Sequence, residues 1–303
     1  MQGALLLPLV YGLLGLFALG FAFRSVRLAR MPVHLRWELA PVPHEKGKAA
    51  YGGSYFEELD WWTKPREKSL LSELAYMGQE ILFLKALHEQ NRSLWWVSFP
   101  FHLGFYLLIG AGGLLVMAEG LGLAGWARAG TGAWAVAPLA LAAIGHGLGL
   151  VGTLGLLAKR GGDPHLRAYS TPESFLNLIL ALAVFATGAA AVATPGFIAE
   201  LRGAGLAVLT ADAGAALPTA LAAHVLAVAV FLGWLPYSRM MHFVAKYFTY
   251  HQVRWDDEPM RAGSALEREM ELQLQRPVSW SAAHIGGDGK RSWASVATEE
   301  KSS

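Results

Sequence analysis

Five long stretches without a single charged side chain limit what this 303-residue chain can fold into. They cover residues 1–23, 93–118, 129–158, 174–199 and 213–238. About 20 apolar residues suffice to cross the hydrocarbon core of a bilayer, so each stretch can form a membrane-spanning helix. Only 16% of the residues are charged, against roughly 25% in soluble domains. We therefore expect an all-α integral membrane protein with five transmembrane helices.

The basic residues predict the orientation of these helices. With the N-terminus outside, the inner segments hold 23 of the 25 Lys and Arg residues, and the outer loops hold only Arg128 and Arg202. The positive-inside rule therefore favours an N-out, C-in topology in the inner (plasma) membrane. The positive charges at Arg24, Arg27 and Arg30 follow the first stretch rather than precede it, so we expect this stretch to remain as an anchor.

This topology divides the chain into four parts: an anchor helix at 1–23, a cytoplasmic loop at 24–92, a four-helix transmembrane core at 93–250 and a partly disordered cytoplasmic tail at 251–303. The loop carries an acidic, aromatic patch at 57–62 and an amphipathic pattern at 69–89. Two compatible interpretations are an interfacial helix with tryptophans at headgroup level and a docking platform for a cytoplasmic partner. In the tail we expect one short helix at 264–275 and disorder beyond it.

The absence of cysteine restricts the chemistry of this chain. It excludes disulfides, iron–sulfur clusters, covalently attached haem and thiolate catalysis. If the protein transfers electrons, non-covalent haem and quinone are the redox groups that remain. The net charge of +2 serves membrane topology, and we predict no nucleic-acid partner.

Four histidines lie within or at the ends of the predicted spans: His102, His146, His224 and His242. Ionisable residues in membrane helices are costly, which favours a functional role. His224 and His242 are 18 residues apart. On a continuous α-helix this interval is five turns, so both imidazoles would leave one face about 27 Å apart. Each ring would then lie near one surface of the membrane.

The depths of these histidines predict two pairs. His102 opens the second span from the inside, and His242 ends the fifth span on the same side. His224 belongs to the outer half, and His146 lies at mid-depth or slightly beyond, a mismatch of several ångströms that helix tilt and the size of a haem could absorb. Neutral imidazole is the usual axial ligand of haem iron in electron transfer. The sequence therefore predicts two haems b, an inner one ligated by His102 and His242 and an outer one ligated by His146 and His224.

Glycines cluster around two of these histidines: Gly104, Gly110, Gly112 and Gly113 follow His102, and Gly145, Gly147, Gly149 and Gly152 surround His146. Residues without side chains would let a flat porphyrin approach the backbone. Close helix–helix contact between small residues explains the same pattern. The sequence leaves both interpretations open.

Residues 95–250 resemble the membrane cytochrome b (gamma) subunit of respiratory nitrate reductase. The resemblance is most specific in the fifth span, where His224 is followed 18 residues later by His242, and Pro236-Tyr237-Ser238-Arg239 precedes the second histidine. That family carries a further histidine in its second helix where this chain has Gly112, and we expect His146 to replace it. The long inner loop is more similar to the relatives in sulfate- and sulfur-metabolising complexes, whose partners resemble heterodisulfide reductase.

The resemblance and the four histidines together predict a di-haem membrane cytochrome b. It would exchange electrons between the quinone pool and a cytoplasmic iron–sulfur subunit, and a periplasmic cytochrome is a further possible partner. Arg239 is a candidate for pairing a haem propionate, or it is a residue that only sets topology. The alternative function is a transporter or proton-channel subunit with a histidine relay and no haem. The predicted spans contain no carboxylate, which disfavours this alternative.

Overall fold

The computed structural model describes residues 3–31, 45–65, 69–123, 132–212, 214, 216–251, 261–282 and 288–298. The chain divides into two compact units. The first combines Met1–Ala29 with Ser69–Tyr247, and the second combines Arg30–Lys68 with Phe248–Ser303. Each unit is described by itself below.

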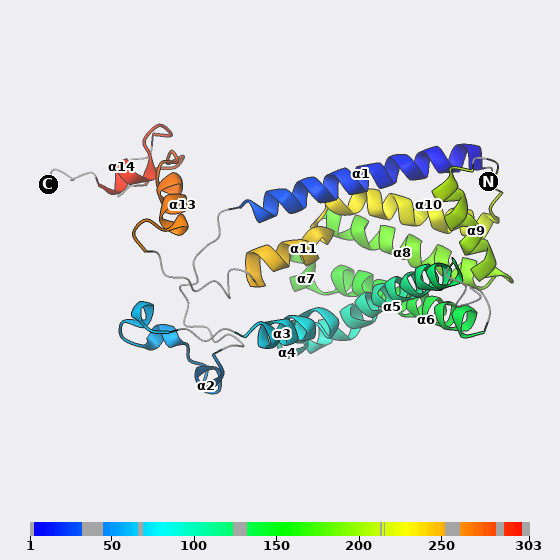
Figure 1. Cartoon of the computed structure of the whole chain (residues 1–303), viewed down its shortest axis with the longest axis horizontal. Helices are drawn as coiled ribbons and strands as arrows, with labels where there is room; N and C mark the ends of the chain where they lie inside the picture. The colour runs from blue at the N-terminus through cyan, green and yellow to red at the C-terminus, as the bar shows by residue number, and fades with distance from the viewer. Residues whose placement is uncertain are drawn as a thin grey trace. The chain divides into compact units, whose positions relative to one another are not determined.

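The first unit is a bundle of five helices that are long and apolar enough to cross a membrane, as the sequence predicts. They are α1 (Gly3–Ala29), α5 (Arg92–Leu123), α6 (Ala133–Gly162), α8 (Pro172–Val192) and α10 (Thr219–Trp234). In the bundle α5 packs on α6, α6 on α8, α8 on α10, and α10 on α1. Figure 1 shows these helices side by side.

Glycines bring α5 and α6 into close contact. A methyl group added at Gly104 would lie 2.7 Å from the carbonyl oxygen of Gly145, and one added at Gly152 would lie 2.3 Å from the backbone of Phe101. Gly149 leaves the space that the Phe185 ring of α8 fills. These glycines therefore serve helix packing. By contrast, Gly112, Gly113 and Gly147 have nothing within 4 Å of an added methyl group.

The fifth span is not one continuous α-helix, and the prediction that His224 and His242 share a face five turns apart is wrong. The helix α10 ends at Trp234 and is followed by two 3₁₀ turns, η3 (Leu235–Tyr237) and η4 (Arg239–Met241). Ser238 between them is extended, with φ −118° and ψ 174°. The short helix α11 (His242–Lys246) then begins at the second histidine. Pro236 lacks the N–H that a continuing α-helix requires, which accounts for the interruption.

The amphipathic segment before the second span forms two helices instead of one. They are α3 (Leu70–Leu82) and α4 (Lys85–Gln90), separated by Leu84 in a left-handed conformation with φ 51°. Two further helices connect the spans. The helix α7 (Pro164–Ala168) lies between α6 and α8, and α9 (Phe197–Thr210) fills a loop that the sequence left without structure.

The second unit contains short helices: α2 (Lys46–Ala49), η1 (Tyr55–Glu57), η2 (Trp61–Thr63), α13 (Ala265–Leu274) and α14 (Trp293–Ala297). The helix α13 confirms the prediction for residues 264–275. The prediction of disorder beyond it is wrong for α14 and for the bridge that pairs Pro277 with Ser292. In the loop, hydrogen bonds from Lys48 and Lys64 lower the pKa of the Glu58 carboxyl to about 2.

Candidate haem sites

The structure brings His102 and His242 together, with ring centroids 6.2 Å apart and ring planes at 83°. We call them the inner pair, following the predicted orientation. The Nδ1 atom of His102 lies 2.7 Å from the Ser98 carbonyl oxygen, and that of His242 lies 3.3 Å from the Arg239 carbonyl oxygen. A carbonyl can only accept a hydrogen bond, so each Nδ1 carries the proton and each Nε2 keeps its lone pair. That tautomer leaves Nε2 free to bind a metal.

His146 and His224 also lie together and are called the outer pair. Their ring centroids are 5.1 Å apart, and their planes are at 78°. The Nδ1 atom of His224 is 3.3 Å from the hydroxyl oxygen of Thr187 on α8. His146 is buried, with 2% of its surface exposed, and its Nδ1 has no hydrogen-bond partner. A buried ring nitrogen without a partner is costly, and metal ligation is one way to remove that cost.

The spacing of the two pairs can be compared with what two axial imidazoles require. An imidazole nitrogen binds a metal at about 2 Å, so two ligands on opposite sides of one ion place their ring centroids roughly 6 Å apart. The inner pair matches this separation. The outer pair is closer by about 1 Å, which a small rotation of either ring can supply. The inner pair thus has the spacing of two axial imidazoles, whereas the outer pair would have to move apart to take such positions, and the unpartnered Nδ1 of His146 leaves one nitrogen available there.

The number of donors in each pair limits what the pair could hold. Within the described ranges there is no group of three or more His, Asp or Glu side chains that could hold a metal ion. A site built only from protein ligands usually needs three or four. A porphyrin supplies four nitrogens of its own, so two imidazoles are enough.

Aromatic rings fill the space between the two pairs. Phe101 contacts His102 with centroids 5.1 Å apart, and Phe185 contacts His146 at 6.3 Å. Phe101 and Phe185 are themselves 6.0 Å apart, and Phe105 packs against Phe185 at 4.6 Å. These rings come from α5 and α8 and form an apolar partition between the two pairs.

Gly188 makes room for the His146 ring of the outer pair. A methyl group added there would lie 2.1 Å from Nε2 of His146, so only glycine lets the ring occupy this position against α8. Sequence reasoning did not single out this residue or Thr187. Both lie on α8, which contributes no histidine, and a search centred on the histidines and their neighbours in sequence cannot find them.

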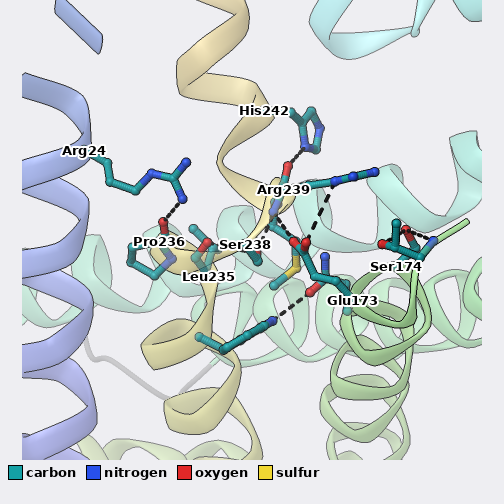
Figure 2. A network of polar contacts seen from close by, with 12 residues as sticks. Arg24, Glu173, Ser174, Leu235, Pro236, Ser238, Arg239 and His242 are labelled. Atoms are coloured by element: carbon teal, nitrogen blue, oxygen red, sulfur yellow. Dashed lines mark hydrogen bonds and ion pairs between the residues drawn. The ribbon is translucent and has the colours of Figure 1, made fainter. Parts of the chain in front are cut away.

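Polar side chains from two neighbouring helices hold the interrupted part of the fifth span, as Figure 2 shows. The Glu173 carboxylate, in the first turn of α8, accepts the backbone N–H of Arg239 at 2.7 Å. Arg24 of α1 donates to the Pro236 carbonyl oxygen at 2.8 Å. The Ser238 hydroxyl accepts the N–H of Met240 and donates to the Leu235 carbonyl. These contacts replace the hydrogen bonds that the interruption removes.

The side chain of Arg239 lies beside Glu173, with 3.8 Å between Nε and Oε2, and 65% of it is exposed. If Arg239 pairs with a haem propionate, as the sequence predicts, its guanidinium must bind both the propionate and the Glu173 carboxylate. What the structure adds is a role for its backbone. Glu173 binds the N–H of Arg239, and the carbonyl oxygen of Arg239 accepts from His242.

No family model matches the chain, and neither a curated protein nor a solved structure matches it. The assignment of a function consequently rests on the residues and their geometry.

Proposed function

We propose that this protein is a di-haem membrane cytochrome b that exchanges electrons between the quinone pool and a cytoplasmic iron–sulfur subunit. The observation that carries the proposal is the meeting of four histidines, three in the spans and one just after the last span, in two pairs at 6.2 and 5.1 Å. Each pair joins residues far apart in the sequence. Chance burial of a single histidine would not produce this arrangement twice.

The residues of this chain hold and orient the cofactors. Ser98 and Arg239 carbonyls fix the inner imidazoles, and Thr187 orients His224. Bound haem supplies one-electron exchange at its iron. The phenylalanine partition places apolar side chains between the pairs, and the two sites would divide electron transfer across the membrane into two shorter steps. A quinone in the membrane would supply or accept the electrons at one end.

The alternative function, a proton relay through histidines without haem, has less support. A relay needs continuous hydrogen bonds between its members. The Nδ1 atom of His146 has no hydrogen-bond partner, so a proton on it has no acceptor within reach. Ligation of a haem would satisfy this nitrogen without such a chain.

A pyridine haemochrome assay of the purified full chain tests the proposal. We expect two haems b per chain and a reducible spectrum with b-type Soret and α bands. One haem per chain would refute the four-ligand assignment and leave the inner pair as the site. A colourless protein that resists haem reconstitution would sink the cytochrome assignment altogether.

The cytoplasmic partner is tested separately. Without cysteine, this chain has no cluster of its own to receive an electron, so an iron–sulfur subunit should bind on the inner side. Photo-crosslinkers in place of Trp61 or Trp62, in the acidic, aromatic loop, should recover such a subunit from membranes. Recovery of only a periplasmic cytochrome, crosslinked through the outer loops, would show that the electron-transfer partner binds on the outer side instead.

A further inference from the structure

The helix α3 exposes its apolar face and buries part of its polar face, which is the reverse of a surface helix in a water-soluble protein. At about 100° per residue, its leucines and isoleucine fall within a third of the helix circumference. They point away from the bundle, and these exposed residues are Leu70, Leu71, Leu74, Ile81 and Leu82. Leu71 is 81% exposed, whereas Glu80 on the other side is only 3% exposed. In water, exposing these leucines would cost free energy, and burying the Glu80 carboxylate would not compensate for it.

The polar face is held by residues next to the inner histidine pair. The Glu80 carboxylate accepts from Nζ of Lys246 at 2.9 Å, and Lys246 lies one turn after His242. The Tyr106 hydroxyl donates to the Ile81 carbonyl oxygen at 2.7 Å, and Tyr106 lies one turn after His102. The last turn of α3 is therefore bonded to α5 and α11, the two helices that carry the inner histidine pair.

These bonds also show how far α3 reaches along the bundle. Tyr106 is 14 residues after Arg92, which is about 21 Å along α5. Helical side chains lean towards the N-terminus, so the Tyr106 hydroxyl reaches back part of this distance. Trp95, much closer to the start of α5, donates from its indole to the Phe83 carbonyl at 2.8 Å. The end of α3 thus lies alongside the apolar part of α5, well inside the span Arg92–Ala118.

We propose that α3 and α4 form a re-entrant hairpin whose apolar face contacts the lipid chains of the inner leaflet. Like the leucines of α3, the apolar residues Trp96 and Ile109 of α5 are exposed, as lipid-facing residues of a span would be. Lipid is the occupant that accepts such a face without any polar complement. This inference does not depend on haem, because it rests on the spans and on the faces of α3.

Lys85 at the tip of the hairpin is compatible with this placement. Its Nζ lies 5.2 Å from the centroid of the Tyr76 ring and donates to Gln79 Oε1 at 3.1 Å. Both partners precede it on α3, so the side chain folds back towards the start of the hairpin. Long basic side chains in membranes direct their charge towards the headgroups in this way.

The absence of cysteine makes the test direct, because single cysteines can be introduced without background. Leu71→Cys and Leu82→Cys would carry a nitroxide label in vesicles of phosphatidylethanolamine and phosphatidylglycerol. Ile109→Cys, on the exposed surface of α5, is the matched lipid control, and Leu272→Cys in α13 of the second unit is the matched aqueous control. Oxygen and a water-soluble nickel complex serve as the two relaxing agents.

We expect the labels at 71 and 82 to respond as the label at 109 does, with high oxygen and low nickel accessibility. Nickel accessibility like that of position 272, in a labelled chain whose helical circular dichroism is unchanged, would overturn the proposal. Protection from nickel that appears only when a co-purified subunit is added would assign the face to protein docking instead.

Discussion

The inner and outer histidine pairs are built from different kinds of support. Backbone carbonyls hold both rings of the inner pair, and the ion pairs Glu173–Arg239 and Glu80–Lys246 lie close to it. The outer pair lies in the apolar middle of the bundle, where Thr187 supports His224 and the Nδ1 of His146 has no partner. The inner pair is thus fixed by main chain and charge, and the outer pair by packing. Substitutions should therefore affect the two sites separately.

Removal of a ligand should give the largest effect and test the pairing itself. His146→Ala and His224→Ala should each remove the same haem and leave the other, because both rings belong to one pair. His102→Ala and His242→Ala should remove the second one. Haem content measured per chain should fall from two to one in each variant. If His146→Ala keeps both haems with an unchanged spectrum, His146 is only a packed polar residue and the difference between the pairs has another origin.

Gly188→Ala should damage the outer site alone. The added methyl group would lie 2.1 Å from Nε2 of His146, so the ring must leave its position. We expect loss of most of the outer haem, seen in the reduced-minus-oxidised spectrum, while the inner haem stays. Gly147→Ala is the matched control, because it adds the same methyl group next to His146 where nothing lies within 4 Å. Equal haem loss in both variants would mean that α6 and α8 respond to any added bulk.

Glu173→Ala should change the inner site alone, with a smaller effect. The carboxylate holds the backbone N–H of Arg239, whose carbonyl accepts from His242. We expect a shift in the low-spin electron paramagnetic resonance signal of the inner haem. Glu173→Gln keeps an acceptor oxygen and should restore the signal, and Arg239→Ala keeps the backbone N–H and should leave it unchanged. A shift in Arg239→Ala but not in Glu173→Ala would favour the propionate role of the guanidinium.

Thr187→Val should give the smallest effect, a shift in the outer haem's midpoint potential. The Thr187 hydroxyl donates to the Ala183 carbonyl at 2.6 Å, so its oxygen is left to accept from Nδ1 of His224. This hydrogen bond makes the His224 imidazole a stronger electron donor to a bound iron, which favours the oxidised state of the iron. The potential should therefore rise in Thr187→Val and return in Thr187→Ser, as measured by redox titration. An unchanged potential would show that the Val184 carbonyl beside the ring takes over the bond.

Much of this architecture could be predicted from the sequence because charge and depth are visible in it. The five spans follow from charge-free stretches, and the meeting of His102 with His242 and of His146 with His224 follows from their depths. The break after Trp234 was missed, although Pro236 gave a signal, because the 18-residue interval favoured a regular helix. The break at Leu84 had no such signal, since a left-handed leucine depends on tertiary contacts.

The support around the histidines was less predictable than the histidines themselves. Glu173 directly precedes the charge-free stretch 174–199 and suggests a residue of the membrane boundary, whereas Glu80 belongs to the amphipathic segment 69–89 and suggests part of its polar face. Only the fold shows that one binds the Arg239 backbone and that the other is buried against Lys246. The helix α9 was also missed, because Glu200 and Arg202 interrupt its apolar pattern.

Because of the interruption between Trp234 and His242, no continuous α-helix joins α10 to α11. A bilayer that becomes thicker or thinner changes the tilt of its helices, and a tilt of α10 moves His224 directly. His242 belongs to the short helix α11, and the bonds of Arg24 to Pro236 and of Glu173 to Arg239 tie the two turns before it to α1 and α8. We therefore expect the distance between the two histidine pairs to change with membrane thickness more than the spacing within the inner pair does. Lipid composition would then affect the outer pair more than the inner pair.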